Sequence, residues 1–203
     1  HAKGHYEGGI DLSNTLPEGV IERATRIRCI ITDVDGVLTD GKLVYLPDGS
    51  VYPSGFHVHD GMGIRAALEV GLSVVIISGN WTEAVRRRAE DLRVSAHYLG
   101  VGDKMVPLRN VMRDHEVSLE EIAYIGDDLN DLAPLQSVGL ACTVPNSAPE
   151  AKQCAHYVTT REGGAGAVRE IIEVILRSKG LWEEAVARFL HEIDTKGLSL
   201  PGG

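Results

Sequence analysis

Basic residues are in short supply in this chain of 203 residues: 20 Lys and Arg stand against 29 Asp and Glu, and the formal net charge is -9. Proteins that bind the phosphate backbone of nucleic acids carry clustered Lys and Arg, so we expect no nucleic-acid partner. Long apolar runs are also missing, since none approaches the roughly 20 residues that cross a bilayer. No basic segment followed by an apolar one opens the chain, so we expect no membrane partner and a cytoplasmic location.

Cysteine is rare as well, and its pattern argues against a metal site. Cys29, Cys142 and Cys154 lack the paired spacing of zinc ligands, and two of them lie in or beside apolar runs, so we expect buried, reduced thiols. His57 and His59 stand two residues apart, but no third His or Cys lies near them to complete a zinc set. We expect these histidines to line a substrate pocket or to end a strand.

The length of the chain and its 43% of hydrophobic residues fit one globular domain with a continuous core. We expect residues 1–16 to be a leader or a remnant of cloning, residues 17–180 to form the core, and residues 181–203 to form a C-terminal helix and tail. The helix is predicted from apolar residues at helical spacing between Leu181 and Leu190, and the tail after Lys196 is expected to fray.

Short apolar runs bounded by Gly, Asp or Ser alternate with helical patterns along the core. A short helix is expected to end near Arg26. Strands are predicted at residues 28–32, 72–77, 96–99, 122–125, 140–144 and 156–159, and helices at residues 61–70, 81–92, 104–115, 129–138 and 165–177. This alternation predicts an α/β fold, a Rossmann-like parallel sheet with helices on both faces.

Residues 42–56 break this alternation. Two short apolar segments flank Pro47-Asp48-Gly49-Ser50, a sequence typical of a tight turn, which predicts a β-hairpin. The hairpin is a small insertion between the first strand and the first crossover helix. Because a two-stranded ribbon is only marginally stable alone, we expect it to recruit a second copy of the chain.

Two carboxylates stand at the end of the first predicted strand, where Asp33 and Asp35 are followed by Gly36. Ligands of open α/β sheets collect beyond the carboxyl ends of the strands, and Gly36 allows a sharp turn there. Two unpaired carboxylates in one small volume repel each other unless a divalent cation neutralises them. A helix cap would account for one of these aspartates but not for both.

A second acidic cluster, Asp127, Asp128 and Asp131, follows the predicted strand at residues 122–125. One cluster alone could be a helix cap with a favourable dipole charge. Two clusters at the same edge of a parallel sheet indicate a site for a hard cation. We expect Mg²⁺, which takes one or two carboxylates and completes its shell with phosphate and water.

Two further segments could hold a phosphate group. Ser78-Gly79-Asn80 follows another predicted strand at the start of a helix, and it offers a hydroxyl group and backbone N–H groups to an anion. A lone Ser at such a place is otherwise a plain helix cap. Lys104 also begins a predicted helix, where the helix dipole disfavours a cation. It is either a solvated surface residue or the partner of an anionic ligand.

These four segments resemble, in order and location, the four motifs of the haloacid dehalogenase superfamily of phosphohydrolases, over roughly residues 26–179. The resemblance implies that Asp33 is the nucleophile that forms an aspartyl-phosphate and that Asp35 acts as general acid and then as general base. It also implies that Ser78 and Lys104 hold the phosphoryl oxygens. The metal would be bound by Asp33, Asp35 (through its backbone carbonyl) and Asp127, with Asp128 and Asp131 in the outer shell.

Many members of this superfamily carry a cap domain after the first or the second motif. Here residues 36–77 hold only the hairpin and one predicted helix, and residues 80–103 hold only one helix and one strand, so we expect no cap domain. An open site exposes a covalent intermediate to water unless the substrate or another subunit covers it. The missing cap also argues against a mutase, which must exclude water.

Three segments resemble one family more closely. Residues 33–41 (DVDGVLTDG), 56–64 (FHVHDGMGI) and 163–170 (GGAGAVRE) are similar to 3-deoxy-D-manno-octulosonate 8-phosphate phosphatases. The resemblance implies Mg²⁺-dependent hydrolysis of a 2-keto-3-deoxy sugar-acid phosphate and a role in lipopolysaccharide supply. It also implies a homotetramer joined by its hairpins, in which the C-terminal segment of one subunit covers the site of another. Two alternatives stay open, a 2-keto-3-deoxy-nononate 9-phosphate phosphatase and a non-catalytic phosphatase-like oligomerisation module.

The substrate-binding residues depart from this family's pattern. Members tend to have Arg where this chain has His59, Asn80 and Ala165, and the nononate relatives tend to have Glu in place of Asn80. The partner of the substrate carboxylate is therefore unassigned. The residues that we predict to bind the substrate or its phosphate are Ser78, Gly79, Asn80, His59, Asp60 and Arg86. A module that only accepts phosphate would not need Asp35, so its presence favours catalysis.

Overall fold

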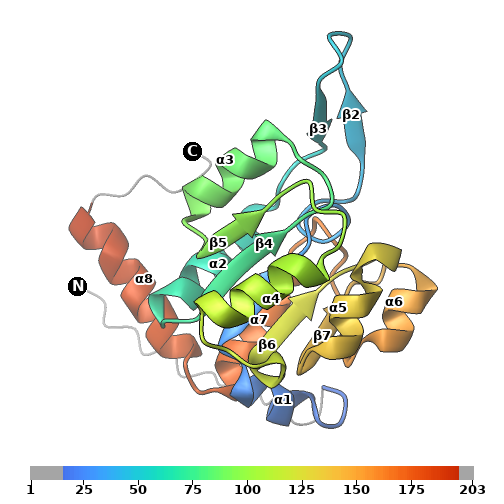
Figure 1. The fold of residues 1–203 in the computed structure, drawn as a ribbon. Coiled ribbons are helices and arrows are strands. Elements are labelled where there is room, and N and C mark those ends of the chain that lie inside the picture. Colours follow the sequence, from blue (N-terminus) through green and yellow to red (C-terminus); the bar gives the residue numbers. More distant parts are fainter. Residues whose placement is uncertain (1–15, 197–203) are drawn as a thin grey trace.

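The computed structural model describes residues 16–196, and Figure 1 shows a parallel sheet enclosed by helices. The predicted leader, apart from its last residue, and the predicted frayed tail after Lys196 lie outside the described residues. The six strands lie in the order β5-β4-β1-β6-β7-β8, and every neighbouring pair is parallel. Their bounds are β1 Cys29–Thr32, β4 Ser73–Ile77, β5 Ala96–Tyr98, β6 Ile122–Ile125, β7 Leu140–Thr143 and β8 Tyr157–Val158. The predicted α/β fold with a parallel sheet is confirmed.

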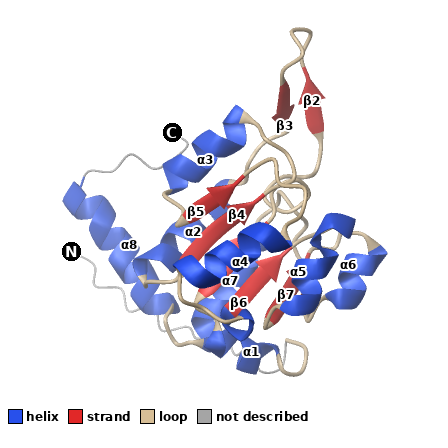
Figure 2. Cartoon of the chain, in the orientation of Figure 1, coloured by secondary structure: helices blue, strands red, loops and turns tan. Residues whose placement is uncertain are grey.

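Helices lie on both faces of the sheet (Figure 2). Each face is covered by its own apolar layer. Successive residues of a strand point to opposite faces, so Ile30 of β1 packs into one layer and Ile31 into the other. The first layer is formed with α1 Val20–Arg26, α2 Val58–Glu69, α3 Glu83–Leu92, α7 Ala167–Ser178 and α8 Trp182–Lys196. The second is formed with α4 Met105–Asp114, α5 Leu132–Ser137 and α6 Pro149–Cys154. The central strands are therefore buried on both faces, as their continuous apolar runs predict.

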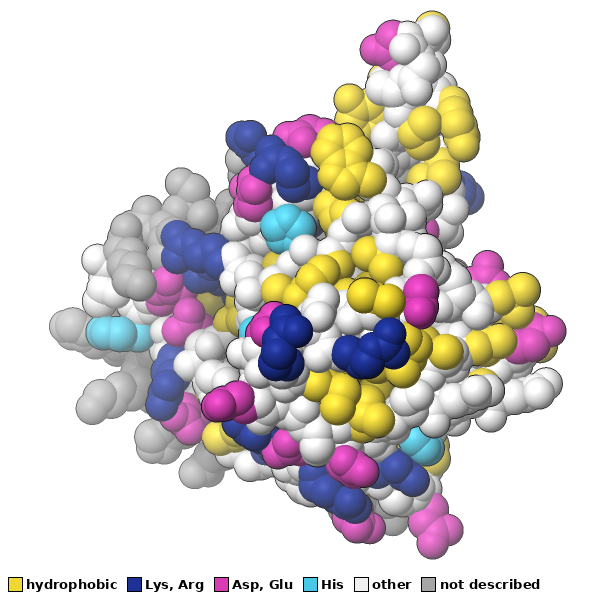
Figure 3. All heavy atoms as spheres, viewed as in Figure 1, with side chains coloured by type: hydrophobic (Ala, Val, Ile, Leu, Met, Phe, Trp, Pro, Cys, Tyr) yellow, Lys and Arg dark blue, Asp and Glu magenta, His cyan; other side chains and the backbone are white. Residues whose placement is uncertain are grey.

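The insertion after β1 is the predicted hairpin, with β2 Leu43–Tyr45 paired antiparallel to β3 Val51–Pro53. It projects from the body of the molecule (Figure 1) and carries hydrophobic side chains on its surface (Figure 3). Tyr45 is 73% exposed, and Val44, Leu46 and Tyr52 are also exposed. No cap domain accompanies it among the described residues: residues 36–77 contain the hairpin, α2 and β4.

The structure corrects two local predictions and adds one helix. The histidines do not end a strand: His57 is the N-cap of α2, where its Nδ1 accepts a hydrogen bond from the backbone N–H of His59 at 3.2 Å. The helix predicted at residues 129–138 is split into a 3₁₀ turn at Leu129–Asp131 and the short helix α5. The helix α6 was not predicted, although Pro149 at its first position is a usual start signal.

The C-terminal helix α8 packs on α2 and α7. The ring of Trp182 lies against the guanidinium groups of Arg169 and Arg177, whose Cζ atoms are 4.7 and 5.1 Å from the ring centroid. Further along the helix, Glu192 forms a buried ion pair with Arg65 of α2 at 2.7 Å. None of the helices within residues 16–196 is both long and apolar enough to cross a membrane.

Candidate active site

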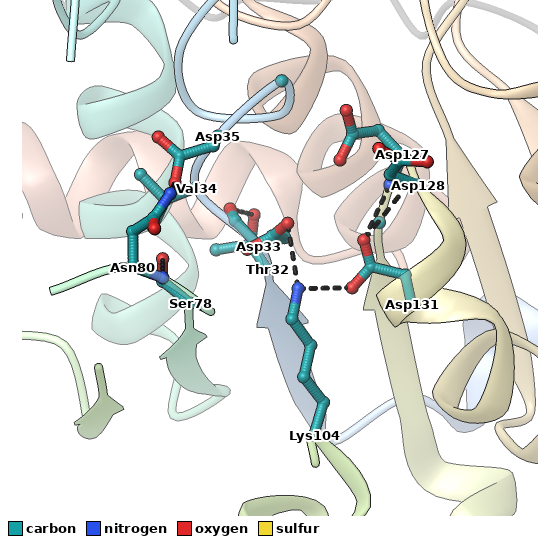
Figure 4. A network of polar contacts seen from close by, with 12 residues as sticks. Thr32, Asp33, Val34, Asp35, Ser78, Asn80, Lys104, Asp127, Asp128 and Asp131 are labelled. Carbon is teal, nitrogen blue, oxygen red and sulfur yellow. Dashed lines mark hydrogen bonds and ion pairs between the residues drawn. The ribbon is translucent and has the colours of Figure 1, made fainter. Parts of the chain in front are cut away.

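The predicted acidic residues meet at the carboxyl ends of the central strands (Figure 4). Asp33 directly follows β1, and its backbone N–H donates to the carbonyl of Ile125 at the end of β6, at 2.9 Å. Asp127 follows β6 by two residues, so the parallel register places the two acidic segments side by side. They open on a pocket of about 440 Å³ that is lined by Asp33, Asp35, Gly41, Gly79, Asn80, Asp127, Asp128 and Asn130.

Lys104 reaches into this site from the N-terminal end of α4 (Figure 4). Its Nζ lies 2.9 Å from Oδ2 of Asp33 and 2.6 Å from Oδ1 of Asp131, and its side chain is 0% exposed. Burial alone would lower the pKa of Lys104, but the two carboxylates outweigh it and raise the pKa. The lysine is therefore a buried cation of the site, and the alternative of a solvated surface residue is wrong.

Asp131 has all its acceptor positions occupied. Besides Lys104, its Oδ1 accepts from the hydroxyl group of Tyr124 at 2.6 Å, and its Oδ2 accepts from the backbone N–H groups of Asp127 and Asp128 at 3.0 and 3.4 Å. The side chain is fully buried. Asp131 thus organises the second acidic loop and orients Lys104, which fits an outer-shell position better than direct binding of a metal.

Two buried carboxylate oxygens of the site, Oδ1 of Asp33 and Oδ1 of Asp127, have no hydrogen-bond partner in the described part of the chain. Ligand oxygens of Asp33, Asp127 and Asp131 lie within 4.8 Å of one another. Burial and then the charge of Asp131 raise the pKa of Asp33, and burial, Asp131 and Asp128 raise the pKa of Asp127 to about 7. Buried, unpaired oxygens with disfavoured negative charge fit a divalent cation, which would neutralise both.

Asp35 lies on the opposite side of Asp33 from Asp127 (Figure 4). It is half-buried, whereas Asp33 is buried. Its Oδ2 accepts a hydrogen bond from Nδ2 of Asn80 at 2.8 Å. The two carboxylates of the first motif therefore have different surroundings: one faces a lysine at the floor of the pocket, and the other faces a neutral amide nearer the solvent.

The loop that carries Asp35 is buttressed from the far end of the chain. A Cβ atom on Gly163 would lie 1.7 Å from the carbonyl oxygen of Gly36, so the two backbones are in direct contact. The backbone N–H of Gly164 donates to the carbonyl of Val37 at 2.9 Å. The segment between β8 and α7 thus supports the turn that follows the two carboxylates.

Ser78 does not begin a helix, and that prediction is wrong. Helix α3 starts at Glu83, and Thr82 is its N-cap, with Oγ1 accepting from the backbone N–H of Val85 at 3.2 Å. Ser78 instead lies fully buried in the turn after β4, where its Oγ accepts from the backbone N–H of Asn80 at 3.1 Å. Of this segment, Gly79 and Asn80 line the pocket.

The other predicted substrate residues have partners away from the pocket lining. Asp60 is buried between α2 and α7, where its Oδ1 accepts from the backbone N–H of Arg169 at 2.8 Å and so caps α7. Arg86 is paired with Glu83 and Glu90 on its own helix. His59 is exposed in the first turn of α2. A role of these three residues in substrate binding stays a prediction.

Sequence reasoning missed Gly41 and Asn130, which line the pocket, and Tyr124, which fixes Asp131. Asn130 lies within the acidic segment, so its position was a usable signal. Tyr124 belongs to a buried strand, and nothing in a continuous apolar run marks one hydroxyl group as part of a site.

Gly36→Ala is expected to weaken Mg²⁺ binding by about 10-fold or more, the effect of losing a contact that orients a metal ligand. The added Cβ would lie 1.9 Å from Oδ2 of Asp127, and the residue has a φ of +91°. Titration calorimetry with Mg²⁺ measures the change. Gly49→Ala is the matched control, because Gly49 has a φ of +85° and no atom within 4 Å of the new Cβ. Equal affinities in the two variants would contradict the prediction.

The chain is similar to known hydrolases in sequence and in fold. A family model for haloacid dehalogenase-like hydrolases matches residues 100–172. The 3-deoxy-D-manno-octulosonate 8-phosphate phosphatase KdsC of Yersinia pestis is 39% identical over 170 residues, which cover 84% of this chain and 90% of that protein. The enzyme of the same name from Escherichia coli K12 is 38% identical, with 82% and 88% covered.

A crystal structure of the phosphatase of the same name from Moraxella catarrhalis, in complex with a magnesium ion, a phosphate ion and a KDO molecule, has the same fold. Its TM-score is 0.80 at 35% sequence identity, and the match covers 84% of this chain and 97% of that one. The similarity therefore extends over almost the whole length of that protein.

Proposed function

The chain belongs to the 3-deoxy-D-manno-octulosonate 8-phosphate phosphatase family of the haloacid dehalogenase superfamily, and we propose that it hydrolyses 3-deoxy-D-manno-octulosonate 8-phosphate or a close 2-keto-3-deoxy sugar-acid phosphate. As a member of that family it is a hydrolase of phosphoric monoesters. The observation that carries the proposal is the arrangement of Asp33. Lys104 holds its Oδ2, its buried Oδ1 has no hydrogen-bond partner among the described residues, and a carboxylate oxygen of Asp33 lies within 4.8 Å of one of Asp127.

In the proposed reaction, Asp33 attacks the phosphorus atom with a carboxylate oxygen, and the bond between phosphorus and the sugar oxygen breaks. Asp35 gives its proton to the departing sugar oxygen. Asp35 then takes a proton from water, whose oxygen attacks the aspartyl-phosphate, and Asp33 is released with inorganic phosphate. Lys104 keeps Asp33 in one orientation and supplies a fixed positive charge beside the phosphoryl group.

Mg²⁺ would be held by Asp33, Asp127 and the backbone carbonyl of Asp35. When bound, it supplies positive charge that offsets the charges of the carboxylates and of the phosphoryl group. Asp128 lines the pocket next to Asp127, and Asp131 orients the loop from behind. The Moraxella catarrhalis relative binds a magnesium ion and a phosphate ion, which supports this assignment.

The test is phosphate release from a panel of phosphomonoesters in Mg²⁺. The panel holds 3-deoxy-D-manno-octulosonate 8-phosphate, 2-keto-3-deoxy-nononate 9-phosphate and p-nitrophenyl phosphate, each with and without EDTA. We expect the highest kcat/KM for the octulosonate ester and loss of turnover in EDTA. A preference for the nononate ester would assign 2-keto-3-deoxy-nononate 9-phosphate as the substrate. A folded protein that releases phosphate from none of the esters would favour the non-catalytic module.

We further propose that the chain forms a homotetramer through its hairpins and that the C-terminal segment of a neighbouring subunit covers the open pocket. The exposed hydrophobic side chains of the hairpin support this, because apolar surface of this kind is usually buried in an interface. We also propose that the protein is a cytoplasmic enzyme that supplies lipopolysaccharide synthesis. The proposal is supported only by the substrate for which its relatives are named, 3-deoxy-D-manno-octulosonate 8-phosphate.

Tyr45→Asp is expected to shift the protein to a smaller assembly, because the charged side chain would have to be buried in the interface. Size-exclusion chromatography with light scattering measures the mass. Val106→Asp is the control, since Val106 is also exposed, at 49%, but lies on α4. An unchanged mass for Tyr45→Asp, or the same shift in both variants, would place the interface elsewhere.

A further inference from the structure

Asn80 makes the hydrogen bond that ties the second carboxylate of the site to a neighbouring strand. Its Nδ2 donates to Oδ2 of Asp35 at 2.8 Å, and both residues line the pocket (Figure 4). In residues 16–196 no other side chain donates a hydrogen bond to Asp35. The orientation of Asp35 in the pocket therefore depends on one amide group.

The backbone of Asn80 is itself fixed. Its N–H donates to Oγ of Ser78 at 3.1 Å, and its carbonyl accepts from the N–H of Gly100 at 3.2 Å. The turn is tied to the end of β5 by a bond from the N–H of Ser78 to the carbonyl of Tyr98, at 2.9 Å. The amide of Asn80 thus extends from a rigid support, which is what a group needs in order to hold another in place.

We propose that Asn80 is a positioning residue that holds Asp35 in the orientation for proton transfer, rather than a residue that binds the substrate. This inference rests on the proposed function and adds a role that the four motifs do not include. The Nδ2 contact to Asp35 already uses one of the two N–H donors of the amide. The group that the substrate approaches is then Asp35, aligned by its neighbour.

The neutral amide suits this role. An amide carries both donor and acceptor groups, so Asn80 can stay in contact with Asp35 before and after the proton has moved to the leaving oxygen. A carboxamide is therefore compatible with both halves of the proposed reaction.

The test compares two leaving groups in Asn80→Ala. An alkoxide leaving from a sugar phosphate needs a proton, whereas p-nitrophenolate leaves without one. We expect kcat for 3-deoxy-D-manno-octulosonate 8-phosphate to fall by about 10²-fold, the lower end of general acid contributions, with KM changed by less than about 3-fold. Single-turnover release of p-nitrophenol should stay within about 3-fold of the wild type.

A double-mutant cycle separates positioning from direct contact. If Asn80 acts through Asp35, then adding Asn80→Ala to Asp35→Ala should lower the residual rate no further. An equal loss in both backgrounds, or a rise in KM without loss of kcat, would overturn the proposal in favour of substrate binding.

Two further measurements keep the test interpretable. Asn80→Ser keeps a polar side chain that is too short to contact Asp35. It should show the same loss of kcat as Asn80→Ala, and it replaces that variant in the test if Asn80→Ala folds poorly. If the wild type hydrolyses p-nitrophenyl phosphate but no sugar phosphate, the substrate assignment fails. The cycle can then be read from steady-state p-nitrophenol release, because Asp35 still has to activate water.

Discussion

Asp33→Asn is expected to lower phosphate release by at least about 10³-fold, because loss of a nucleophile removes the covalent route as a whole. The substitution keeps the size of the side chain, which is buried at the floor of the pocket and touches Lys104. The variant should also fail to gain the mass of one phosphoryl group when it is quenched during turnover, whereas the wild type should gain it. Initial rates and intact-protein mass spectrometry measure the two effects.

Asp114→Asn is the matched control for this prediction. Asp114 is an exposed residue at the end of α4 and pairs with Arg113 on the surface, so the same chemical change there should leave the rate within about 2-fold. A phosphoryl adduct that persists in Asp33→Asn would show that another carboxylate is the nucleophile. Full activity of the Asp33→Asn variant would contradict a covalent mechanism through Asp33.

Lys104→Met is expected to lower the free energy of unfolding by about 3–5 kcal/mol, the usual cost of removing one partner from a buried ion pair. The lysine is fully buried and contacts both Asp33 and Asp131, so its loss would leave two carboxylates facing each other without a cation. Phosphate release should fall as well, because the fixed charge beside the phosphoryl group is lost. Urea unfolding in EDTA, followed by tryptophan fluorescence, measures the stability.

The double variant Lys104→Met with Asp131→Asn tests the reason for this loss. Asp131→Asn removes one of the two negative charges that face each other, so it should return part of the stability. It should return none of the activity, since the introduced neutral amide cannot replace the ammonium group. If Lys104→Met alone unfolds at the same urea concentration as the wild type, Lys104 is not the counter-charge of the two aspartates. Mg²⁺ is left out of the unfolding measurements because it would itself screen the carboxylates.

The acidic residues of the site could be predicted from the sequence for a simple reason. The carboxyl ends of parallel strands share one edge, so Asp33 and Asp127 were expected at the same edge once their strands were recognised, and the pairing of β1 with β6 makes them neighbours. The burial of Lys104 could not be predicted in this way. It depends on the hydroxyl group of Tyr124 and on the position of Asp131 behind the loop, and these contacts arise only when separate strands pack.

The local errors have the same kind of cause. His57 was expected to line a substrate pocket or to end a strand, and the second of these is wrong because its side chain caps the helix that follows. The segment at Ser78 was predicted to begin a helix, whereas α3 begins at Glu83 and Thr82 is its N-cap. The contact of Asp60 with the backbone N–H of Arg169, near the start of α7 at N-cap Gly166, was not foreseen either, while its predicted role in substrate binding stays a prediction. The periodicity of apolar residues predicts helices and strands, but it does not reveal such contacts of single polar side chains.

The support that Gly163 and Gly164 give to the turn after Asp35 sets an order of events during synthesis. A ribosome delivers the amino-terminal half first, so a nascent chain that ends near residue 155 already contains every acidic group of the pocket. It still lacks the backbone that presses on Gly36 and Val37. We therefore expect the turn that carries the two carboxylates to reach its final conformation only after residues 163 and 164 have been synthesised.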